Sequence, residues 1–404
     1  MNVFKNKNFT FLFCATLISN LGSNIFNFII GWYILEKTGS VLQMGTFISI
    51  PYIIHILFSP FFGILCDKFD RKKIVVYTDI INAICMLLVF GVLVFEILSG
   101  IELLIFYLIN IIICITDSLA NIGTFTLKKE CCNESEIKKC NTLFAIQSNF
   151  TTISGSVISG FLYYYIGMKY CILLNLLSYL ISAFFENRIC IMNIQINEHN
   201  SKQKILSDIK EGISYVRNRK DIMQIFVFAI LFNSTLNPLI QVIMPYIFNT
   251  KGILVTNYSL VKSCLTFGSV FCSFYLLKKD SNLTLITFCS FFKWYIFIYL
   301  FYIVNYKLFN FNIFSYDIYI LINYCIFFSI GIIIALFNIP FNNYIHLTVE
   351  SHMMGRVFSL FNVASHSFTP AALIISSYLI KYNIDLVLIL SIILIVLCYF
   401  KAEY

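Results

Sequence analysis

Amide side chains recur at helical spacing in two apolar stretches, where they could hydrogen bond a small molecule. In the first stretch the amides lie at i, i+4 and i+7, which places them on one helix face. A buried amide costs free energy unless it is partnered, so both stripes should face the protein interior. They either join helices by hydrogen bonds worth ~0.6 kcal/mol each or line a central cavity. The predicted substrate pathway comprises Asn20, Asn24, Asn27, Gln147, Asn149, Asn233, Asn237 and Gln241.

Charged residues inside apolar stretches form the second group of candidates. A charge within a membrane span is costly and marks ion or substrate pathways. Asp117 is the first candidate for a protonatable coupling residue, and Lys262 is the second. Lys293 lies beside Trp294 and Tyr295, where snorkelling or pairing is expected instead of transport.

The residues that could perform covalent or metal chemistry do not occur at the spacings that such chemistry needs. His346 and His352 lack the spacing of ligands on one helix face, and the 14 cysteines include no Cys-x-x-Cys pair. There is no carboxylate pair and no phosphate-binding Gly-Lys-Ser/Thr loop. Most cysteines stand singly among apolar residues and behave as small apolar side chains. We therefore expect neither an enzyme nor a resident metal or cofactor.

The composition places these residues in a membrane protein. Hydrophobic residues make up 59% of the 404 residues and charged residues 12%, against about 45–50% and ~25% in soluble domains. The apolar residues form long blocks without the alternation of barrel strands, and about 20 such residues span a bilayer as a helix. An all-α integral membrane protein of about 12 transmembrane helices is predicted. The predicted spans are 9–35, 42–65, 74–97, 101–127, 142–167, 168–189, 222–249, 253–277, 282–304, 316–340, 356–379 and 384–400.

The basic residues predict the orientation of these spans. With both termini in the cytoplasm, all but seven of the 28 Lys and Arg residues fall in cytoplasmic segments. Two of the seven lie inside spans, and the outside loops hold Lys37, Lys169, Lys251, Lys307 and Lys381. This bias is the positive-inside pattern of a multi-pass protein. It accounts for the net charge of +8 without nucleic-acid binding and predicts location in the cell (plasma) membrane.

The chain divides near its middle into two halves of equal span number. Residues 1–189 form the predicted N-terminal six-helix bundle, 190–221 a cytoplasmic linker with an amphipathic helix, and 222–404 the C-terminal bundle. An internal repeat supports the division. Asn20 and Asn24 correspond to Asn233 and Asn237 at an offset of 213 residues. At an offset of 217, Asn121 corresponds to Asn338, and Lys139, Leu143 and Phe144 correspond to Arg356, Leu360 and Phe361.

The loop after the second span carries a specific motif. It reads Gly63-Ile-Leu-Cys-Asp67-Lys68-Phe-Asp70-Arg71-Lys72-Lys73, followed by Asp79. This loop resembles the signature Gly-x-x-x-Asp-Arg/Lys-x-Gly-Arg-Arg of the major facilitator superfamily, with Asp70 where the family usually has Gly. Residues 36–40, 208–215 and 355–360 resemble its macrolide-efflux and siderophore-export branch. The resemblance implies two pseudo-symmetric six-helix bundles that alternate access to a central cavity.

The motif also suggests a gate. A small residue at Gly63 lets two helices approach closely, and a carboxylate can lie at the positive N-terminus of a neighbouring helix. By the resemblance, that neighbour is the eleventh span, so the contact latches the cytoplasmic side; a plain positive-inside anchor is the alternative. The predicted gating residues are Gly63, Asp67, Lys68, Arg71, Lys72, Lys73, Asp79, Gly355 and Arg356.

These features predict a secondary transporter that couples efflux of a small lipophilic or amphipathic compound, of drug, macrolide or siderophore type, to protons. The expected partners are this substrate, a proton or other coupling ion and the lipid bilayer, with the protein as a monomer. Two departures from the family keep a lipid flippase, an uptake protein or a non-transporting relative open. Residues 111–117 contain no Arg, and residues 154–160 contain no Gly-Pro pair.

Overall fold

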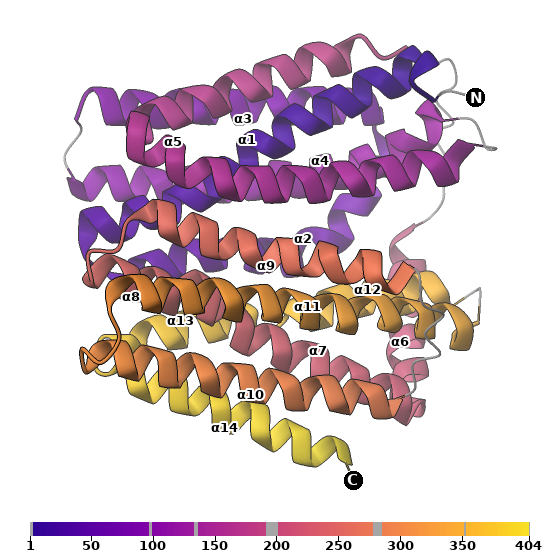
Figure 1. Ribbon diagram of the computed structural model, residues 1–404. Coiled ribbons are helices and arrows are strands. Elements are labelled where there is room, and N and C mark those ends of the chain that lie inside the picture. The colour runs from indigo at the N-terminus through magenta and orange to yellow at the C-terminus, as the bar shows by residue number, and fades with distance from the viewer. Residues whose placement is uncertain are drawn as a thin grey trace. The chain divides into compact units, whose positions relative to one another are not determined.

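A computed structural model describes residues 3–96, 99–132, 136–190, 201–277, 285–350 and 353–403, and the regular elements within these ranges are helices. Figure 1 shows them as long, closely packed rods. Nine helical stretches of the described residues are long and apolar enough to cross a membrane. Within the described residues, each of the twelve predicted spans lies largely in helix, so the all-helical membrane prediction is confirmed.

The helices group into two compact units. The N-terminal unit contains Met1–Tyr33 and Ile50–Lys202, and the C-terminal unit contains Ile34–Ser49 and Gln203–Tyr404. The division falls inside the predicted linker, and the segment Ile34–Ser49 joins the C-terminal unit. There Gly45 packs against Ser377 and Leu373.

The N-terminal unit is built from five long helices, except that the end of the first and the start of the second belong to the C-terminal unit. An interior cluster near their ends includes Phe9, Leu12, Leu127 and Phe144. Burial of such side chains contributes most of the packing energy where the helix ends leave the lipid. The helices are α1 (Lys7–Thr38), α2 (Val41–Lys68), α3 (Arg71–Val94), α4 (Ser99–Cys131) and α5 (Ile137–Asn187).

The long helix α5 contains the fifth and sixth predicted spans. Gly167 interrupts it with φ 76° and ψ 175°, a backbone conformation that is non-helical and favours glycine. The predicted break at Gly167-Met168-Lys169 is therefore confirmed.

The C-terminal unit begins with α6 (Ser201–Asn218), the amphipathic helix predicted in the linker. The predicted span 222–249 consists of three elements, because a π-helical turn follows Pro238, which lacks an N–H donor. These elements are α7 (Lys220–Pro238), η3 (Leu239–Ile243) and α8 (Met244–Thr250). The remaining helices are α9 (Val255–Leu277), α10 (Leu285–Asn310), α11 (Tyr316–Thr348), α12 (Met354–His366), α13 (Thr369–Ile380) and α14 (Ile384–Glu403).

Two span boundaries differ from the prediction. The span predicted to end at Pro340 continues as α11 to Thr348, so the proline is accommodated within the helix. The span predicted over 356–379 is divided into α12 and α13, with Pro370 in the first turn of α13. Proline suits the first turn because the N–H it lacks has no partner there.

Glycines allow α9 and α11 to touch through their backbones. A Cβ on Gly268 would lie 2.0 Å from the carbonyl oxygen of Phe328, and one on Gly331 would lie 1.9 Å from that of Leu265. Close approach at small residues is the usual way in which transmembrane helices pack without a hydrophobic driving force.

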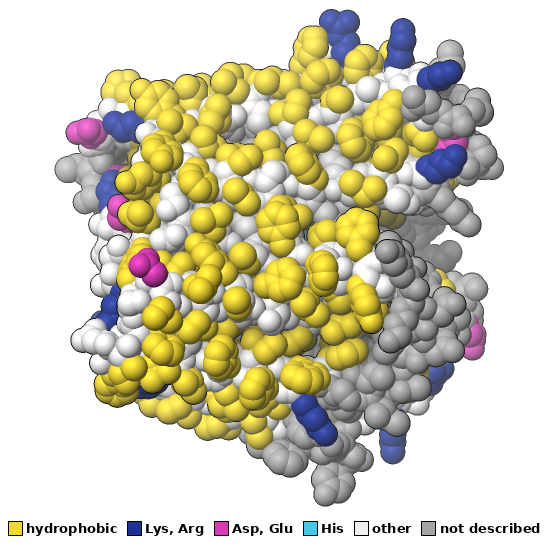
Figure 2. Space-filling view, in the orientation of Figure 1, with side chains coloured by type: hydrophobic (Ala, Val, Ile, Leu, Met, Phe, Trp, Pro, Cys, Tyr) yellow, Lys and Arg dark blue, Asp and Glu magenta, His cyan; other side chains and the backbone are white. Residues whose placement is uncertain are grey.

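Hydrophobic side chains cover the visible surface of both units, and the visible charged side chains gather toward the helix ends (Figure 2). Leu104, Phe150, Phe271 and Leu321 are each at least half exposed. An exposed apolar belt of this extent would be unfavourable in water and is satisfied by lipid.

Candidate functional site: a polar cavity in the N-terminal unit

A cavity of about 330 Å³ lies within the N-terminal unit. Its walls come from α1, α3, α4 and α5. Four charged side chains line it: Asp79, Asp117, Glu186 and Lys128. Its polar lining consists of Thr16, Ser19, Asn20, Ser23, Asn27, Asn121, Thr124, Gln147, Ser148 and Tyr179.

Asp117 is held by a short hydrogen-bond network between α3 and α4. Asn82 Nδ2 donates to Asp117 Oδ1 over 2.8 Å. Thr116 Oγ1 donates to the amide oxygen of the same asparagine, which fixes the orientation of the amide. Asp117 therefore lines the cavity in a defined position. Its other carboxylate oxygen, Oδ2, takes no part in the hydrogen bond from Asn82.

Asp79 and Glu186 are the most buried carboxyl groups of the cavity, with 5% and 2% of their surface exposed. Asp79 interacts electrostatically with both Asp117 and Glu186. Within the described part of the chain, Asp79 Oδ2 and Glu186 Oε2 accept no hydrogen bond. Buried carboxyl oxygens are costly when charged and unpartnered, so these atoms are suited to hold a proton or a cationic group.

Gln147 joins α5 to α1. Its Nε2 atom donates to Thr16 Oγ1 over 2.8 Å and to the backbone oxygen of Phe13 over 3.3 Å. The amide oxygen, Oε1, has no partner among the described residues. Gln147 therefore adds an acceptor to the wall of the cavity.

Lys128 is the positive group among the charged lining residues. Its ammonium lies 4.0 Å from the ring centroid of Phe144, within the range of a cation–π contact. Among the other lining residues, Tyr179 and Ser23 share a hydrogen bond of 2.9 Å between their hydroxyl groups. The three carboxyl groups leave the lining acidic.

The predicted pathway residues of this unit separate into two groups. Asn20, Asn27 and Gln147 line the cavity. Asn24 packs against Gly155 of α5, where an added Cβ would lie 2.8 Å from the asparagine Cβ, and Asn149 is exposed and outside the lining. The i, i+4, i+7 pattern thus identified the helix but not the contact that Gly155 makes with its middle residue.

The predicted pathway residues of the C-terminal unit form a ladder of hydrogen bonds along α7 and η3. Asn237 Nδ2 donates to the backbone oxygen of Asn233 over 3.0 Å, and Gln241 Nε2 donates to Asn237 Oδ1 over 2.9 Å. Asn233 itself donates to the backbone oxygen of Ala229. These bonds satisfy amides within their own helix. The second candidate charge, Lys262, lies half-buried in α9 of the same unit.

The predicted gating motif runs from the end of α2 into α3, and its residues from Arg71 onward begin α3. Asp70 is the N-cap, and its Oδ1 atom accepts from the backbone N–H of Lys72 at 3.0 Å and of Lys73 at 3.5 Å. The aspartate found where the family usually has glycine thus satisfies two otherwise unpaired donors of the first helical turn. Lys73 is exposed, as expected for a residue at a membrane face.

Arg71 of the motif forms an ion pair with Glu130, which ties the start of α3 to the end of α4. Asp79, the last motif residue, lies two turns further along α3 in the polar cavity. The side chains of Asp67 and Lys68 and the positions of Gly63 and Gly355 in the packing lie outside what the structure describes. The proposed latch at Asp67 stays a prediction.

Arg356, the predicted gating residue that corresponds to Lys139 in the repeat, pairs with Glu211 of the linker helix α6. Its guanidinium lies 2.8 Å from the carboxylate of Glu211. Gly212 packs beside this pair, since a Cβ there would meet Leu360 at 2.7 Å. The segment 208–215, which resembled the efflux branch, therefore contacts α12.

Arg219 and Cys131, which lie outside the spans, have shifted pKa values. Arg219 forms hydrogen bonds of 2.9 and 3.2 Å with the Asp221 carboxylate, which raises the pKa of the guanidinium further above its usual range. Burial raises the pKa of the Cys131 thiol to about 12, so this cysteine stays protonated and unreactive.

Sequence reasoning missed Glu186, Tyr179 and Lys128 as cavity residues. Glu186 stands inside the predicted span 168–189, and a carboxyl group within a span is itself a functional signal. Lys128 was assigned to the cytoplasmic positive charge, because it follows the predicted end of its span by one residue.

The comparisons with known proteins give the class of the protein. The chain is 31% identical over 175 residues to a protein named putative bacilysin exporter BacE of Bacillus subtilis (strain 168), covering 43% of this chain and 41% of that one. It is 33% identical over 82 residues to macrolide efflux protein A of Streptococcus pyogenes, covering 20% of each. The chain thus aligns with about two fifths of the first of these curated relatives and one fifth of the second.

Solved structures share the fold over the full length. A bacterial homologue of the iron transporter ferroportin, in its inward-facing state, superposes with a TM-score of 0.77 at 14% identity, covering 100% of this chain and 99% of that one. The nucleoside transporter NupG superposes with a TM-score of 0.73 at 14% identity over 100% and 98% of the two chains. Helical membrane fold and relatives together define a multi-pass membrane transporter and not an enzyme.

The family model described as Major Facilitator Superfamily matches residues 12–373. The chain therefore belongs to the Major Facilitator Superfamily, and its efflux-type relatives confirm the resemblance drawn from the loop motif.

Proposed function

We propose that this protein exports an amphipathic compound from the cytoplasm through the cell membrane, in exchange for protons, with its termini in the cytoplasm. The observation that supports this most strongly is the acidic cavity. It brings Asp79, Asp117 and Glu186 together inside one unit, although these residues come from three separate helices. Carboxyl groups that share a confined space exchange protons and cations in competition, because several charges held close together repel.

The same cavity narrows the substrate class. A lining of amides, hydroxyls and carboxyl groups is poorly suited to a wholly lipophilic molecule, since its polar groups would be left unpaired. It suits the polar end of an amphipathic compound, and its acidic balance favours an end that carries an amine. The relatives named for bacilysin export and macrolide efflux support export, and the positive-inside bias supports the orientation.

In this mechanism the substrate amine and the proton compete for the same carboxyl groups. Binding of the amine from the cytoplasm displaces a proton, and a proton taken up on the outer side releases the amine there. Asp117 is the central group, because Asn82 and Thr116 fix its position. Gln147 and the α1 asparagines orient the substrate by hydrogen bonds.

Transport by purified protein in proteoliposomes tests the proposal. An imposed proton gradient should drive uptake of a basic macrolide into inside-out vesicles that contain the unmodified protein. Uptake into vesicles that contain Asp117→Asn should fall to the level of empty vesicles. Glu102→Gln is the matched control, because Glu102 lies on the same helix outside the cavity lining and accepts a 2.9 Å hydrogen bond from Tyr33. Gradient-driven transport by Asp117→Asn at the unmodified rate would refute the coupling role.

The flippase alternative has its own readout in the same vesicles. Movement of a fluorescent phospholipid between leaflets, with no gradient-dependent movement of the macrolide, would favour it over export.

A further inference from the structure

The cavity of the N-terminal unit contains a cation that the proposed proton exchange does not use. Lys128 lines the cavity together with the three carboxyl groups. Its ammonium lies against the ring of Phe144, which is also a lining residue, so the positive charge is at the cavity wall. Within the described residues Lys128 forms no ion pair, and its other interaction is with the thiol of Cys132. The ammonium can therefore bind an anionic group of a ligand.

Helix α4 places this cation on the same face as the central carboxyl group. Asp117 and Lys128 are 11 residues apart, which is about three turns at ~3.6 residues per turn. Asn121 and Thr124 lie between them on the same stripe, and both line the cavity. The wall formed by α4 thus presents a carboxyl group, an amide, a hydroxyl and an ammonium in that order.

The separation of the two charges limits the length of a ligand that reaches both. Eleven residues of helix rise about 16 Å. A long helical side chain leans toward the helix N-terminus, so the lysine side chain shortens this gap, and its contact with Phe144, two turns inside α5, agrees with that direction. After a hydrogen bond of about 3 Å at each end, roughly 5–10 Å remain between the charges of the ligand. Extended peptide spans about 3.3–3.6 Å per residue, so two or three residues fit.

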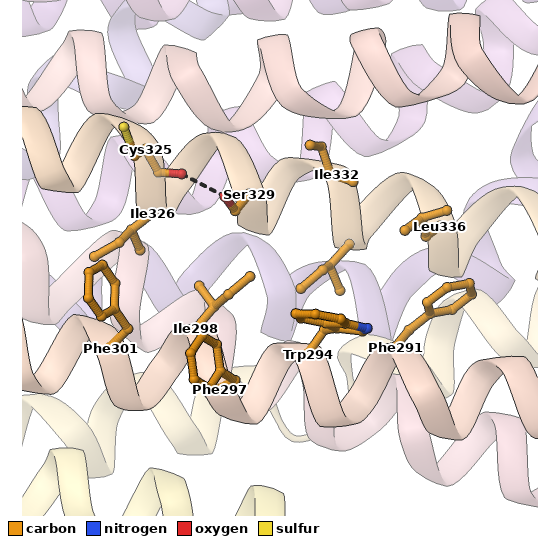
Figure 3. A pocket seen from close by; sticks show the side chains of 11 residues that line it. Phe291, Trp294, Phe297, Ile298, Phe301, Cys325, Ile326, Ser329, Ile332 and Leu336 are labelled. Carbon is orange, nitrogen blue, oxygen red and sulfur yellow. Dashed lines mark hydrogen bonds between the residues drawn. The ribbon is translucent and has the colours of Figure 1, made fainter.

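The described groove of the C-terminal unit offers no comparable pair of charges. It has a volume of about 470 Å³ and lies between α10 and α11, where Figure 3 shows aromatic and aliphatic lining side chains such as Trp294, Phe297 and Leu336. Its lining residues include no charged side chain, and the hydroxyl of Ser329 donates to the backbone oxygen of Cys325 over 2.8 Å. A ligand with two opposite charges finds partners in the N-terminal cavity and not in this groove.

We propose that the transported compound is a zwitterion with the length of a di- or tripeptide, whose carboxylate binds Lys128 while its amine binds Asp117. The proposal rests on the proposed function, because the amine at Asp117 is taken from it. It makes Lys128 a specificity-determining residue that takes no part in proton exchange. Asp79 and Glu186 repel a carboxylate when they are ionised, so a preference for one must come from Lys128.

Two matched probes test this by isothermal titration calorimetry with the purified full chain in detergent. One is the dipeptide phenylalanyl-leucine, and the other is its C-terminal amide, which keeps the amine and both side chains but lacks the carboxylate. The unmodified protein should bind the dipeptide about tenfold more tightly, as expected for a hydrogen bond between two charged groups. Lys128→Gln should abolish or reverse this preference. A lysine that only anchored the cytoplasmic face would not distinguish the probes.

Two further variants separate recognition from folding. Lys128→Arg keeps the charge and should keep the preference for the dipeptide. Lys139→Gln removes a cation that is exposed on α5 outside the cavity lining, and should keep it as well. The amide should bind Lys128→Gln at least as tightly as it binds the unmodified protein, because the lost charge repels a cation, so this probe also reports folding.

Failure of this proposal is distinguishable from failure of the proposed function. The vesicle assay uses a macrolide that has an amine and no carboxylate, so it tests the exchange at Asp117 without the carboxylate contact. Equal binding of the two probes by the unmodified protein, or a preference for the dipeptide that survives Lys128→Gln, would overturn the carboxylate site. Gradient-driven macrolide transport beside either result would leave the proton exchange intact.

Discussion

The two units keep a common packing scheme but differ in the chemistry of their interiors. In the N-terminal unit Phe144 packs against Phe13 with ring centroids 5.6 Å apart, and in the C-terminal unit Phe361 packs against Phe226 at 5.2 Å. These pairs correspond through the same offsets of 213 and 217 residues that relate the asparagines. The repeat inferred from sequence is therefore also a repeat of contacts.

Outside the asparagines, the correspondence fails at three polar positions of the cavity. At the same two offsets, Thr16, Asp117 and Gln147 have as counterparts Ala229, Ile334 and Ala364. In place of a carboxyl cluster, the C-terminal unit buries an aromatic series in which Phe232 lies 4.7 Å from Tyr295. Tyr299 and Tyr302 of α10 continue this series and are fully buried.

The difference suggests a division of labour between the units. Duplicated halves need the same packing to fold, but proton exchange needs its carboxyl groups on one side only. Under the proposed function, the polar groups of the N-terminal unit bind protons and the polar end of the substrate. The C-terminal unit is built as an aromatic scaffold with closely packed glycine helices. Paired substitutions at corresponding or comparable positions test this comparison.

The largest stability effects are expected from the shared aromatic pair. Phe144→Ala and Phe361→Ala each remove a ring from an interior contact, which costs about 3 kcal/mol or more. Phe144 should cost more, because it is 7% exposed and Phe361 is only half-buried. Thermal unfolding in detergent measures both. If only one of the two variants lost stability, the two corresponding contacts would not both stabilise their units.

Alanine substitutions at one glycine of each unit should differ more clearly in their stability cost. Gly331→Ala places a Cβ against the backbone of Leu265, which cannot move away, and should cost up to about 3 kcal/mol. Gly22→Ala meets side-chain atoms only: Ser178 Oγ at 2.1 Å and Asn175 Oδ1 at 2.5 Å, which can rotate away, and Ser178 Cβ at 2.9 Å, which must shift slightly. It should therefore cost less, about 1 kcal/mol. The melting temperatures of both variants provide the comparison. Equal costs would contradict the expectation that a contact with backbone at Gly331 is harder to relieve than a contact with side chains at Gly22.

A smaller effect is expected at the start of α3. Asp70→Ala removes an N-cap and should destabilise the helix by about 1 kcal/mol, whereas Asp70→Gly, the residue usual in the family, should cost only a few tenths. Hydrogen exchange of the Lys72 and Lys73 amides reports this turn directly. If neither variant speeds exchange, the two hydrogen bonds of Asp70 do not stabilise the turn.

The sequence was sufficient to predict the helices and part of the candidate site. Spans were predictable because lipid exposure demands uninterrupted apolar blocks, and Gly167 marked a break that only glycine accommodates easily. The predicted span 316–340 was confirmed, because Tyr316–Ile339 is long and apolar enough to cross a membrane. The continuation of α11 to Thr348 was not predicted, because Pro340 breaks an isolated helix but is tolerated where neighbouring helices support the backbone. Helical periodicity selected Asn20 and Asn27 for the cavity, but it could not show that Asn24 packs on Gly155.

The carboxyl cluster was the least predictable feature. Asp79, Asp117 and Glu186 are separated by long stretches of chain, and they meet only because α3, α4 and α5 pack around one space. Asp117 stood out as a charge in a span, whereas Asp79 was assigned to the neighbouring loop motif. These three residues come together through the packing of separate helices, which no local sequence pattern predicts.

Proton release on substrate binding tests the central claim most directly. In weakly buffered detergent with a pH-indicator dye, a basic macrolide should displace protons from the unmodified protein and from Glu102→Gln. With Asp117→Asn the release should fall sharply, even at macrolide concentrations that saturate binding. Undiminished release from Asp117→Asn would contradict the central role of Asp117 in proton exchange.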